Sequence, residues 1–472
     1  MEPVLRKDSP VPTTNPGLVV GTERAAVVVA TLASFVTPFM GSSVNVALPA
    51  IGRELEMDAL GLSWVATAYL LTAAVFLVPF GKLADIRGRK AVFRDGILLY
   101  TLASLACGLV PSSGWLIAAR AVQGLGAAGM FGTNVAILTS VIPPGRRGTA
   151  LGINVASVYL GLSLGPFLGG ILTDHFGWRS IFLLNGPLGL GVVSLVITKL
   201  KGEWAGDRNQ RFDLAGSMLY GGSLALLMYG FGKLPGAAGA ALSGAGAAGL
   251  VSFVAWERRV KNPVLDVRLF TGNRLFAMSN LAALINYSAT FAVGFLLSLY
   301  LQYVRGMSAQ AAGTLLVFQP ALQAAVSPFA GRLSDKVESR IVASGGMGLI
   351  VVGLSLLSFI SAATPPWFVA GCLMFLGIGF GLFSSPNTNA VMGAVEPRFY
   401  AIASATLATM RLLGQMVSMG LAMLVFALLL GDARVSAETQ GDFVDAARVA
   451  FGMFAALSVV GALASLVRGK TR

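Results

Sequence analysis

The chain has 472 residues, of which 55% are hydrophobic and only 12% are charged, and its mean hydropathy is +0.76. Soluble domains carry about 25% charged residues, so this composition excludes a water-soluble globular protein. The formal charge of +13 does not indicate a nucleic-acid partner, because the basic residues stand at the ends of apolar runs and form no single basic patch.

Apolar runs long enough to cross a bilayer follow one another along the chain. A membrane-spanning helix needs about 20 mostly apolar residues. Counting such runs predicts an all-α polytopic membrane protein with fourteen spans that contacts the lipid bilayer. The runs lie near residues 25–49, 62–81, 91–110, 114–137, 149–172, 179–199, 213–232, 237–256, 275–301, 311–331, 340–361, 366–391, 400–429 and 447–467.

The distribution of basic residues gives an independent prediction of topology. Of the 34 Lys and Arg residues, 26 fall on the side of the N-terminus, six fall on the opposite side, and Arg120 and Arg411 lie inside spans. Cytoplasmic segments of membrane proteins carry the excess of Lys and Arg. The pattern therefore places both termini in the cytoplasm and the protein in the cell membrane as a multi-pass protein.

One short segment occurs twice in the chain. Residues 81–90 follow the second span and residues 331–340 follow the tenth, with Gly, Leu and Asp in the same register and an offset of 250 residues. Internal repeats are typical of transporters, in which two similar halves enclose a central site.

This repeat predicts two six-helix bundles with two extra spans between them. The predicted divisions are a cytoplasmic tail (1–24), an N-terminal bundle (25–200), two inserted helices with flanking loops (201–274), a C-terminal bundle (275–467) and a short cytoplasmic tail (468–472).

Several motifs resemble those of one transporter family. Residues 81–90 are similar to the loop signature that the major facilitator superfamily carries between spans 2 and 3. Over residues 25–467 the chain resembles this superfamily and, within it, the fourteen-span drug:proton antiporters. The other similar segments are Arg120 to Gly124, Gly161 to Gly170, Trp178-Arg179, Asn185 to Pro187, Asn262 to Phe270, Tyr300 to Gln302 and Arg411 to Gly414.

The resemblance implies a secondary active transporter that works by alternating access. Its expected activity is efflux of small amphipathic or toxic compounds coupled to protons, by a monomer without a cofactor. Three alternatives stay open: export of an endogenous anion, lipid-like molecule or metabolite, uniport of such a substrate, and a sensor that has lost transport.

One position departs from that branch. Its members usually carry an Asp a few residues before an Asn-Val-Ala-Leu-Pro segment in span 1, and here Met40 stands at that position before Asn45. Proton coupling would then use carboxylates at the membrane edge, for which Asp95, Asp85 and Asp335 are candidates. Without the Asp, a substrate cavity is expected to prefer neutral or anionic compounds to cations.

Two arginines inside spans are the main candidates for the substrate cavity. A guanidinium at this depth is costly unless it faces water, a partner or a substrate. Gln123 lies one turn from Arg120 and Gln415 lies one turn from Arg411, on the same helix faces. The alternative is that carbonyl oxygens cap each arginine and lock two helices together. The other cavity candidates are polar residues within spans: Asn45, Asn154, Tyr159, Asn286, Gln319, Gln323 and Asn387.

Two further segments are candidates for conformational switching. The loop signature is expected to act as a latch, because a carboxylate there can bind the free N–H groups of a neighbouring helix. The glycines and the proline of span 5 allow tight packing and bending. The residues concerned are Gly81, Asp85, Arg87, Gly88, Arg89 and Asp335 in the loops, and Gly161, Gly165, Pro166 and Gly169 in the span.

Enzymatic and metal chemistry are disfavoured by the sequence. Cys107 and Cys372 lie inside apolar runs, His175 is the only histidine, and no metal-ligand spacing is present. A membrane-embedded enzyme would need titratable groups or metal ligands gathered at one depth. The expected partners are therefore a small-molecule substrate, protons and lipid.

Overall fold

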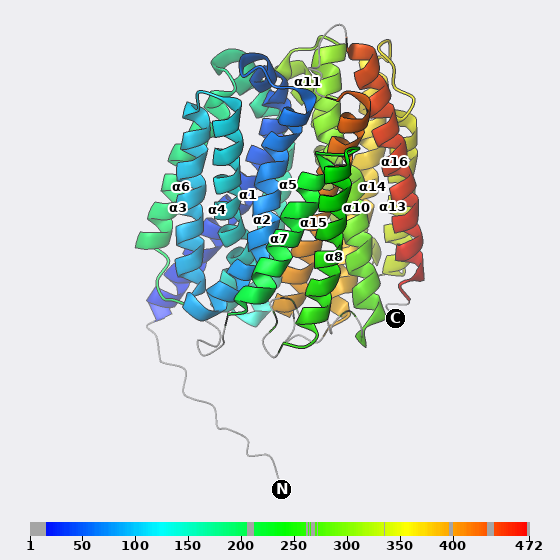
Figure 1. The fold of residues 1–472 in the computed structure, drawn as a ribbon. Coiled ribbons are helices and arrows are strands. Elements are labelled where there is room, and N and C mark those ends of the chain that lie inside the picture. The colour runs from blue at the N-terminus through cyan, green and yellow to red at the C-terminus, as the bar shows by residue number, and fades with distance from the viewer. Residues whose placement is uncertain are drawn as a thin grey trace.

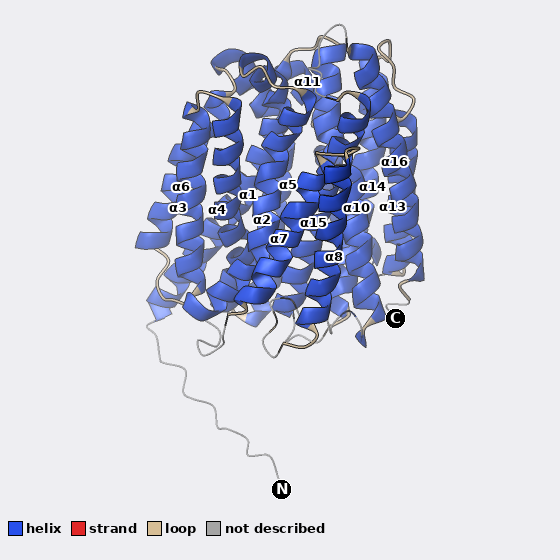
Figure 2. Ribbon diagram, in the orientation of Figure 1, coloured by secondary structure: helices blue, strands red, loops and turns tan. Residues whose placement is uncertain are grey.

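The computed structural model describes residues 16–204, 212–260, 263, 265, 270, 272–334, 336–395, 400–431 and 439–469. Within these residues the chain is helical and contains no strand (Figure 2), which confirms the predicted all-α class. The long helices run side by side as one bundle (Figure 1).

The helices follow the order of the predicted spans. The first part of the chain forms α1 (Pro16–Glu54), α2 (Ala59–Arg87), α3 (Arg89–Leu109), α4 (Ser113–Val141), α5 (Pro144–Phe176), α6 (Arg179–Thr198), α7 (Leu214–Phe231) and α8 (Ala237–Glu257). The second part forms α10 (Arg274–Leu299), the π-helical turn η1 (Tyr300–Val304), α11 (Ala309–Leu316), α12 (Phe318–Ser334), α13 (Ser339–Leu357), α14 (Pro366–Gly393), α15 (Tyr400–Leu429) and α16 (Gln440–Val467).

Side-chain caps fix where several helices begin. Asp58, Asp213, Asn273 and Ser308 each accept a hydrogen bond from the backbone N–H three residues further on, at 2.6 to 3.2 Å. Such caps satisfy N–H groups that have no partner within the helix. The starts of α2, α7, α10 and α11 are therefore set by local sequence.

Thirteen helices in the described part of the chain are long and apolar enough to cross a membrane. The remaining predicted span, near 311–331, is divided at Val317 into α11 and α12. Pro320 explains the division, because it has no N–H to donate to the carbonyl of Leu316 and its ring clashes with that carbonyl in a regular helix. With α11 and α12 as one interrupted span, the structure fits fourteen spans.

The two ends of the helical bundle agree with an even number of spans. The first helix, α1, begins and the last helix, α16, ends on the same side of the bundle (Figure 1). We call this the inner side and the opposite one the outer side. That the inner side faces the cytoplasm stays a prediction.

Helix contacts separate two groups of helices. In the first, α1 packs on α5, and α4 packs on α2 and α3; in the second, α14 packs on α12 and α13, and α10 packs on α15. α7 packs on α8, on α2 and, less extensively, on α15, whereas the contacts of α8 are with α7. We call the groups α1–α6 and α10–α16 the N-terminal and C-terminal halves, and the exact domain boundaries stay predictions.

The sequence repeat has a counterpart in helix packing. A Cβ at Gly96 of α3 would lie 3.1 Å from the Cα of Gly129 in α4, and a Cβ at Gly346 of α13 would lie 2.5 Å from the carbonyl oxygen of Gly379 in α14. Both residues of the second pair are 250 positions after those of the first. Close helix crossings in membranes need small residues, and the two halves place them at equivalent positions.

We predict that Gly126→Val destabilises the N-terminal half. The new side chain would collide with the backbone nitrogen of Tyr100, which cannot move without shifting α3. Overpacking of this kind costs about 1–3 kcal/mol. Thermal unfolding of the purified protein should show a lower midpoint, whereas Gly244→Val on α8, where a Cβ meets nothing within 4 Å, should leave the midpoint unchanged. Equal effects of the two changes would contradict the packing argument.

Candidate functional site

The two halves are joined at the outer ends of their helices. Asp174, near the end of α5, accepts hydrogen bonds from the backbone N–H groups of Ala309 (3.2 Å) and Gln310 (2.8 Å) at the start of α11. A carboxylate is stabilised at a helix N-terminus by the free N–H groups and the helix dipole. A further contact between the halves joins α2 and α15 on the outer side, where the hydroxyl of Thr67 donates to the sulfur of Met423 at 3.4 Å.

A second junction on the outer side links α1 with the turn η1. The Nε2 of Gln302 donates to the carbonyl of Val46 at 2.8 Å, and the hydroxyl of Tyr303 donates to the carbonyl of Pro49 at 3.1 Å. A Cβ at Gly52 would lie 2.9 Å from the Tyr303 hydroxyl oxygen, so the glycine makes this approach possible. These contacts show that the structure is closed on the outer side.

The glycine-rich segment of α5 contacts both halves. A Cβ at Gly161, Gly165 or Gly169 would collide with α1, and a Cβ at Gly313 of α11 would collide with the carbonyl oxygen of Pro166. One helix thus packs tightly against its own half along one face and against the other half along another. The structure places all four predicted switching residues of this span at helix contacts.

Arg120 is enclosed within the N-terminal half. The side chain is 2% exposed, and its Nε donates to the carbonyl of Val65 at 3.0 Å while Nη1 donates to Gln123 at 2.5 Å. Its Cζ lies 4.4 Å from the centroid of the Tyr69 ring, a favourable cation–π contact. These contacts favour the alternative reading of Arg120 as a lock between α2 and α4.

Arg411 lies in a different environment. It is half-buried in α15, and its Nη2 donates to the hydroxyl of Thr388 at 3.1 Å. Its Cζ is 5.7 Å from the ring centroid of Tyr287, which packs edge-to-face on Phe380 at 5.1 Å. The Nε of Arg411 is buried and has no hydrogen-bond partner among the described residues. The Nε of Arg411 thus differs from the Nε of Arg120, which donates to Val65.

Tyr159 brings the N-terminal half to the same region. Its hydroxyl lies 3.2 Å from the Ser384 hydroxyl of α14 and accepts a hydrogen bond from Ser327 of α12 at 3.4 Å. Ser384 precedes Thr388 by one turn, and its carbonyl accepts a hydrogen bond from the Thr388 hydroxyl at 2.9 Å. We call Arg411, Tyr287, Thr388, Ser384 and Tyr159 the Arg411 cluster, a polar and aromatic group where the halves meet.

Two predicted cavity residues make hydrogen bonds between helices instead. Asn154 accepts from the hydroxyl of Ser34 at 2.8 Å and from Asn134 at 3.4 Å, which joins α1, α4 and α5. Asn387 accepts from the buried Arg468 at 2.8 Å. Asn154 thus bonds within the N-terminal half, and Asn387, which precedes Thr388 in α14, bonds within the C-terminal half. Their place in a substrate cavity stays a prediction.

The other predicted cavity residues are distributed over several helices. Asn45 faces α10 from α1, Gln319 and Gln323 lie where α12 packs on α14, and Gln415 is half-buried one turn after Arg411. Asn286 is fully buried, and both polar atoms of its side chain lack a partner among the described residues.

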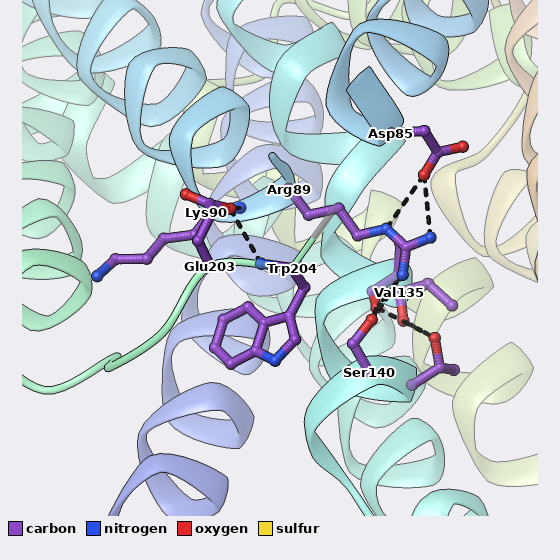
Figure 3. A network of polar contacts seen from close by, with 9 residues as sticks. Asp85, Arg89, Lys90, Val135, Ser140, Glu203 and Trp204 are labelled. Carbon is purple, nitrogen blue, oxygen red and sulfur yellow. Dashed lines mark hydrogen bonds and ion pairs between the residues drawn. The ribbon is translucent and has the colours of Figure 1, made fainter. Parts of the chain in front are cut away.

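The loop signature between α2 and α3 forms a compact polar network on the inner side (Figure 3). Asp85 pairs with Arg89 at 2.9 Å, and Nη1 of Arg89 donates to the hydroxyl of Ser140 in α4 at 2.6 Å. Arg87 lies 4.0 Å from Asp95. Asp85 thus binds a residue of its own half, and its binding to a neighbouring helix N-terminus stays a prediction.

The two glycines of the loop signature have different surroundings, and the second copy is described only in part. The backbone of Gly81 is approached by α4, where a Cβ at Gly132 would lie 3.3 Å from its nitrogen. Gly88 has a φ of +119°, a conformation that favours glycine. Asp335 lies outside the described residues.

Several residues of the junctions were not selected from sequence. Thr388 and Ser384 look like ordinary helix residues, although their spacing of four places them on one face of α14. Asp174 could be recognised only as an acidic residue at a span end, because its partners are backbone groups 135 and 136 residues away.

Two halves of transmembrane helices that meet around polar side chains define a multi-pass membrane transporter. Residues 30–417 and 279–472 match the family model described as Major Facilitator Superfamily. The chain belongs to this superfamily.

Relatives and solved structures agree with this assignment. The chain is 30% identical to the riboflavin transporter RibZ of Clostridioides difficile over 80% of this chain and 82% of that protein. It is 34% identical to the cephamycin export protein CmcT of Amycolatopsis lactamdurans, over 90% and 89%. The fold resembles an inward-facing bacterial homologue of the human lysosomal transporter Spinster, with a TM-score of 0.69, 16% identity and coverage of 96% and 98%.

We predict that Arg120→Leu lowers stability more than Arg411→Leu does. The first change removes the hydrogen bond from α4 to the carbonyl of Val65 in α2 and leaves the buried Gln123 oxygen without its donor, at a cost of about 1–3 kcal/mol. Thermal unfolding of both purified variants gives the comparison. If Arg120→Leu unfolds at the wild-type temperature but loses transport, Arg120 belongs to the substrate path after all.

Proposed function

We propose that the protein exports small amphipathic compounds from the cell by alternating access, and that the Arg411 cluster binds them. The observation that carries this proposal is the half-buried guanidinium of Arg411, which has a buried donor without a partner. Its Nη2 donates to the hydroxyl of Thr388 and its Cζ lies near the ring of Tyr287. Ser384 links Thr388 with the hydroxyl of Tyr159. Such a group can hold an acceptor or anionic group of a ligand while the aromatic rings contact its apolar part.

The charges near the cluster support neutral or anionic substrates. The Asp and Glu residues of the described spans lie near helix ends, so none stands at the depth of Arg411 to neutralise a cation. Met40 is 1% exposed and packs within the apolar core of the bundle. The cluster therefore presents positive charge to a ligand without a nearby carboxylate.

Export as the direction of transport is supported by the names of the relatives. The chain is 33% identical to the multidrug resistance protein Stp of Mycobacterium tuberculosis and 33% identical to the methylenomycin A resistance protein of Streptomyces coelicolor. It is also 31% identical to the puromycin resistance protein of Streptomyces alboniger.

A second candidate is transport of a planar metabolite. The riboflavin transporter is as similar in sequence as several of the resistance proteins. The edge-to-face pair of Tyr287 and Phe380 beside Arg411 is suited to a ring system that carries carbonyl groups. Both candidates use the same cluster and differ in the substrate.

The test of export uses purified protein in liposomes and two dyes that share a xanthene ring, the anionic fluorescein and a cationic rhodamine ester. We expect the protein to move fluorescein faster than the rhodamine ester, and faster with an imposed pH gradient than without one. Equal initial rates with and without the gradient would exclude proton coupling. No transport of either dye, together with no change in drug resistance of cells that express the protein, would contradict efflux of amphipathic compounds.

We predict that Arg411→Met selectively impairs transport of the anionic dye. The change keeps the length of the side chain but removes the charge, and a hydrogen bond to a charged group corresponds to a loss of about 10- to 100-fold in apparent affinity. Initial rates over a range of dye concentrations measure the effect. Arg448→Met on the outer surface is the matched control and should leave transport unchanged. An Arg411→Met protein with wild-type kinetics would remove the cluster from the binding site.

A further inference from the structure

The segment after α6 covers the start of α3. A helix leaves its first N–H groups without partners inside the helix. Here the N–H of Arg89 donates to the carbonyl of Trp204 at 2.7 Å, and the N–H groups of Lys90 and Ala91 donate to the two carboxylate oxygens of Glu203 at 2.8 and 3.1 Å. The whole first turn of α3 is thus capped by residues more than 100 positions away.

Other contacts fix the same segment to the loop signature. The Nζ of Lys90 donates to the carbonyl of Leu200 at 2.5 Å, and the carboxylate of Glu203 also accepts from the N–H of Trp204 at 3.2 Å. A Cβ at Gly88 would lie 2.5 Å from the carboxyl carbon of Glu203. Gly88 is therefore required by its positive φ and also by the space that Glu203 occupies.

The second copy of the loop differs at this point. Glu338 stands 250 residues after Gly88 and is the N-cap residue of α13. The Glu338 carboxylate makes no capping hydrogen bond and lies 3.7 Å from the Nε of Arg340, whereas the first loop has glycine at this position and receives a capping carboxylate from Glu203. The linker after α6 thus supplies the carboxylate that caps the helix at the first copy of the loop.

This linker connects α6 with α7 and α8, the inserted pair of helices. The pair contacts the N-terminal half at a second point. The hydroxyl of Tyr220 in α7 donates to the carbonyl of Ala74 in α2 at 3.2 Å. Near the outer end of α7, a Cβ at Gly420 of α15 would lie 2.8 Å from the Phe231 ring. The inserted pair therefore touches the helices whose outer ends separate when the outer side opens.

We propose that Glu203 and the backbone of Trp204 form a clasp that positions the loop between α2 and α3 for the conformational change of transport. The clasp holds the backbone of Arg89, and the side chain of Arg89 pairs with Asp85 of the same half. Glu203 is thus a positioning residue that stabilises the state closed on the outer side. Through it the inserted helices are coupled to the loop signature.

The test begins with hydrogen exchange of the purified full-length protein. In Glu203→Ala we expect the amides of Lys90 and Ala91 to exchange about tenfold faster, as loss of a helix cap implies. Glu203→Gln keeps one neutral acceptor and should give a smaller increase. Asp445→Asn, a change at an exposed carboxylate on the outer side, should leave exchange at α3 unchanged.

A second measurement reports the conformation without any substrate. Spin labels at Trp115→Cys and Trp367→Cys, which are exposed at the outer ends of α4 and α14, measure how far the halves separate there. The two native cysteines are buried. We expect Glu203→Ala to raise the population with the longer distance by about three- to tenfold over the parent protein.

Each outcome decides the proposal. Unchanged exchange at Lys90 and Ala91 would show that Glu203 does not cap α3, and the clasp would be overturned. Faster exchange with an unchanged distance distribution would show a local cap without influence on the conformational change, which also overturns it. Because neither measurement uses a dye, failure of the proposed export would leave these results intact.

Discussion

Polar groups inside these spans need a partner within the protein or a water-filled path, because the surrounding lipid supplies none. The arrangement of the helices follows from this constraint. Arg120 donates hydrogen bonds to Val65 and Gln123, and Asn154 joins three helices through Ser34 and Asn134. Arg411 is the contrasting case, since it is half-buried and keeps a buried Nε that no described residue accepts from. The same physical rule therefore separates a structural arginine from a candidate ligand-binding arginine.

Among the described residues, hydrogen bonds from side chains of one half to backbone groups of the other lie on the outer side. On the outer side, Asp174 caps α11 and Gln302 binds the carbonyl of Val46, so side chains of one half bind backbone groups of the other. On the inner side, the loop signature binds residues of its own half. Alternating access requires such an asymmetry to reverse during the cycle. The backbone groups that Asp174 binds must then lose this partner when the outer side opens.

Much of the fold could be predicted from the sequence, because apolar runs, basic loops and the repeat are local or periodic signals. The interrupted span was not foreseen as two helices, although Pro320 provides a local reason for it. The residues of the candidate site could be predicted less well than the fold. From the sequence, Arg120 and Arg411 are equivalent, because each has a glutamine one turn away. Their difference arises from residues on other helices, which are Val65 and Tyr69 beside Arg120 and Thr388 and Tyr287 beside Arg411. Glu203 was missed for the same reason, because its partners are backbone N–H groups of a distant loop.

The interruption at Val317 allows the two parts of one span to pack on different halves of the protein. α11 is bound to the N-terminal half through Asp174 and the close approach of Gly313 to Pro166, whereas α12 packs on α14 in the C-terminal half. A continuous helix could not stay packed on both halves when they rotate apart. Two helices that meet at a bend can change their relative angle, which absorbs part of the rotation before the contact of Asp174 with α11 is lost. Pro320 is the residue that permits this bend.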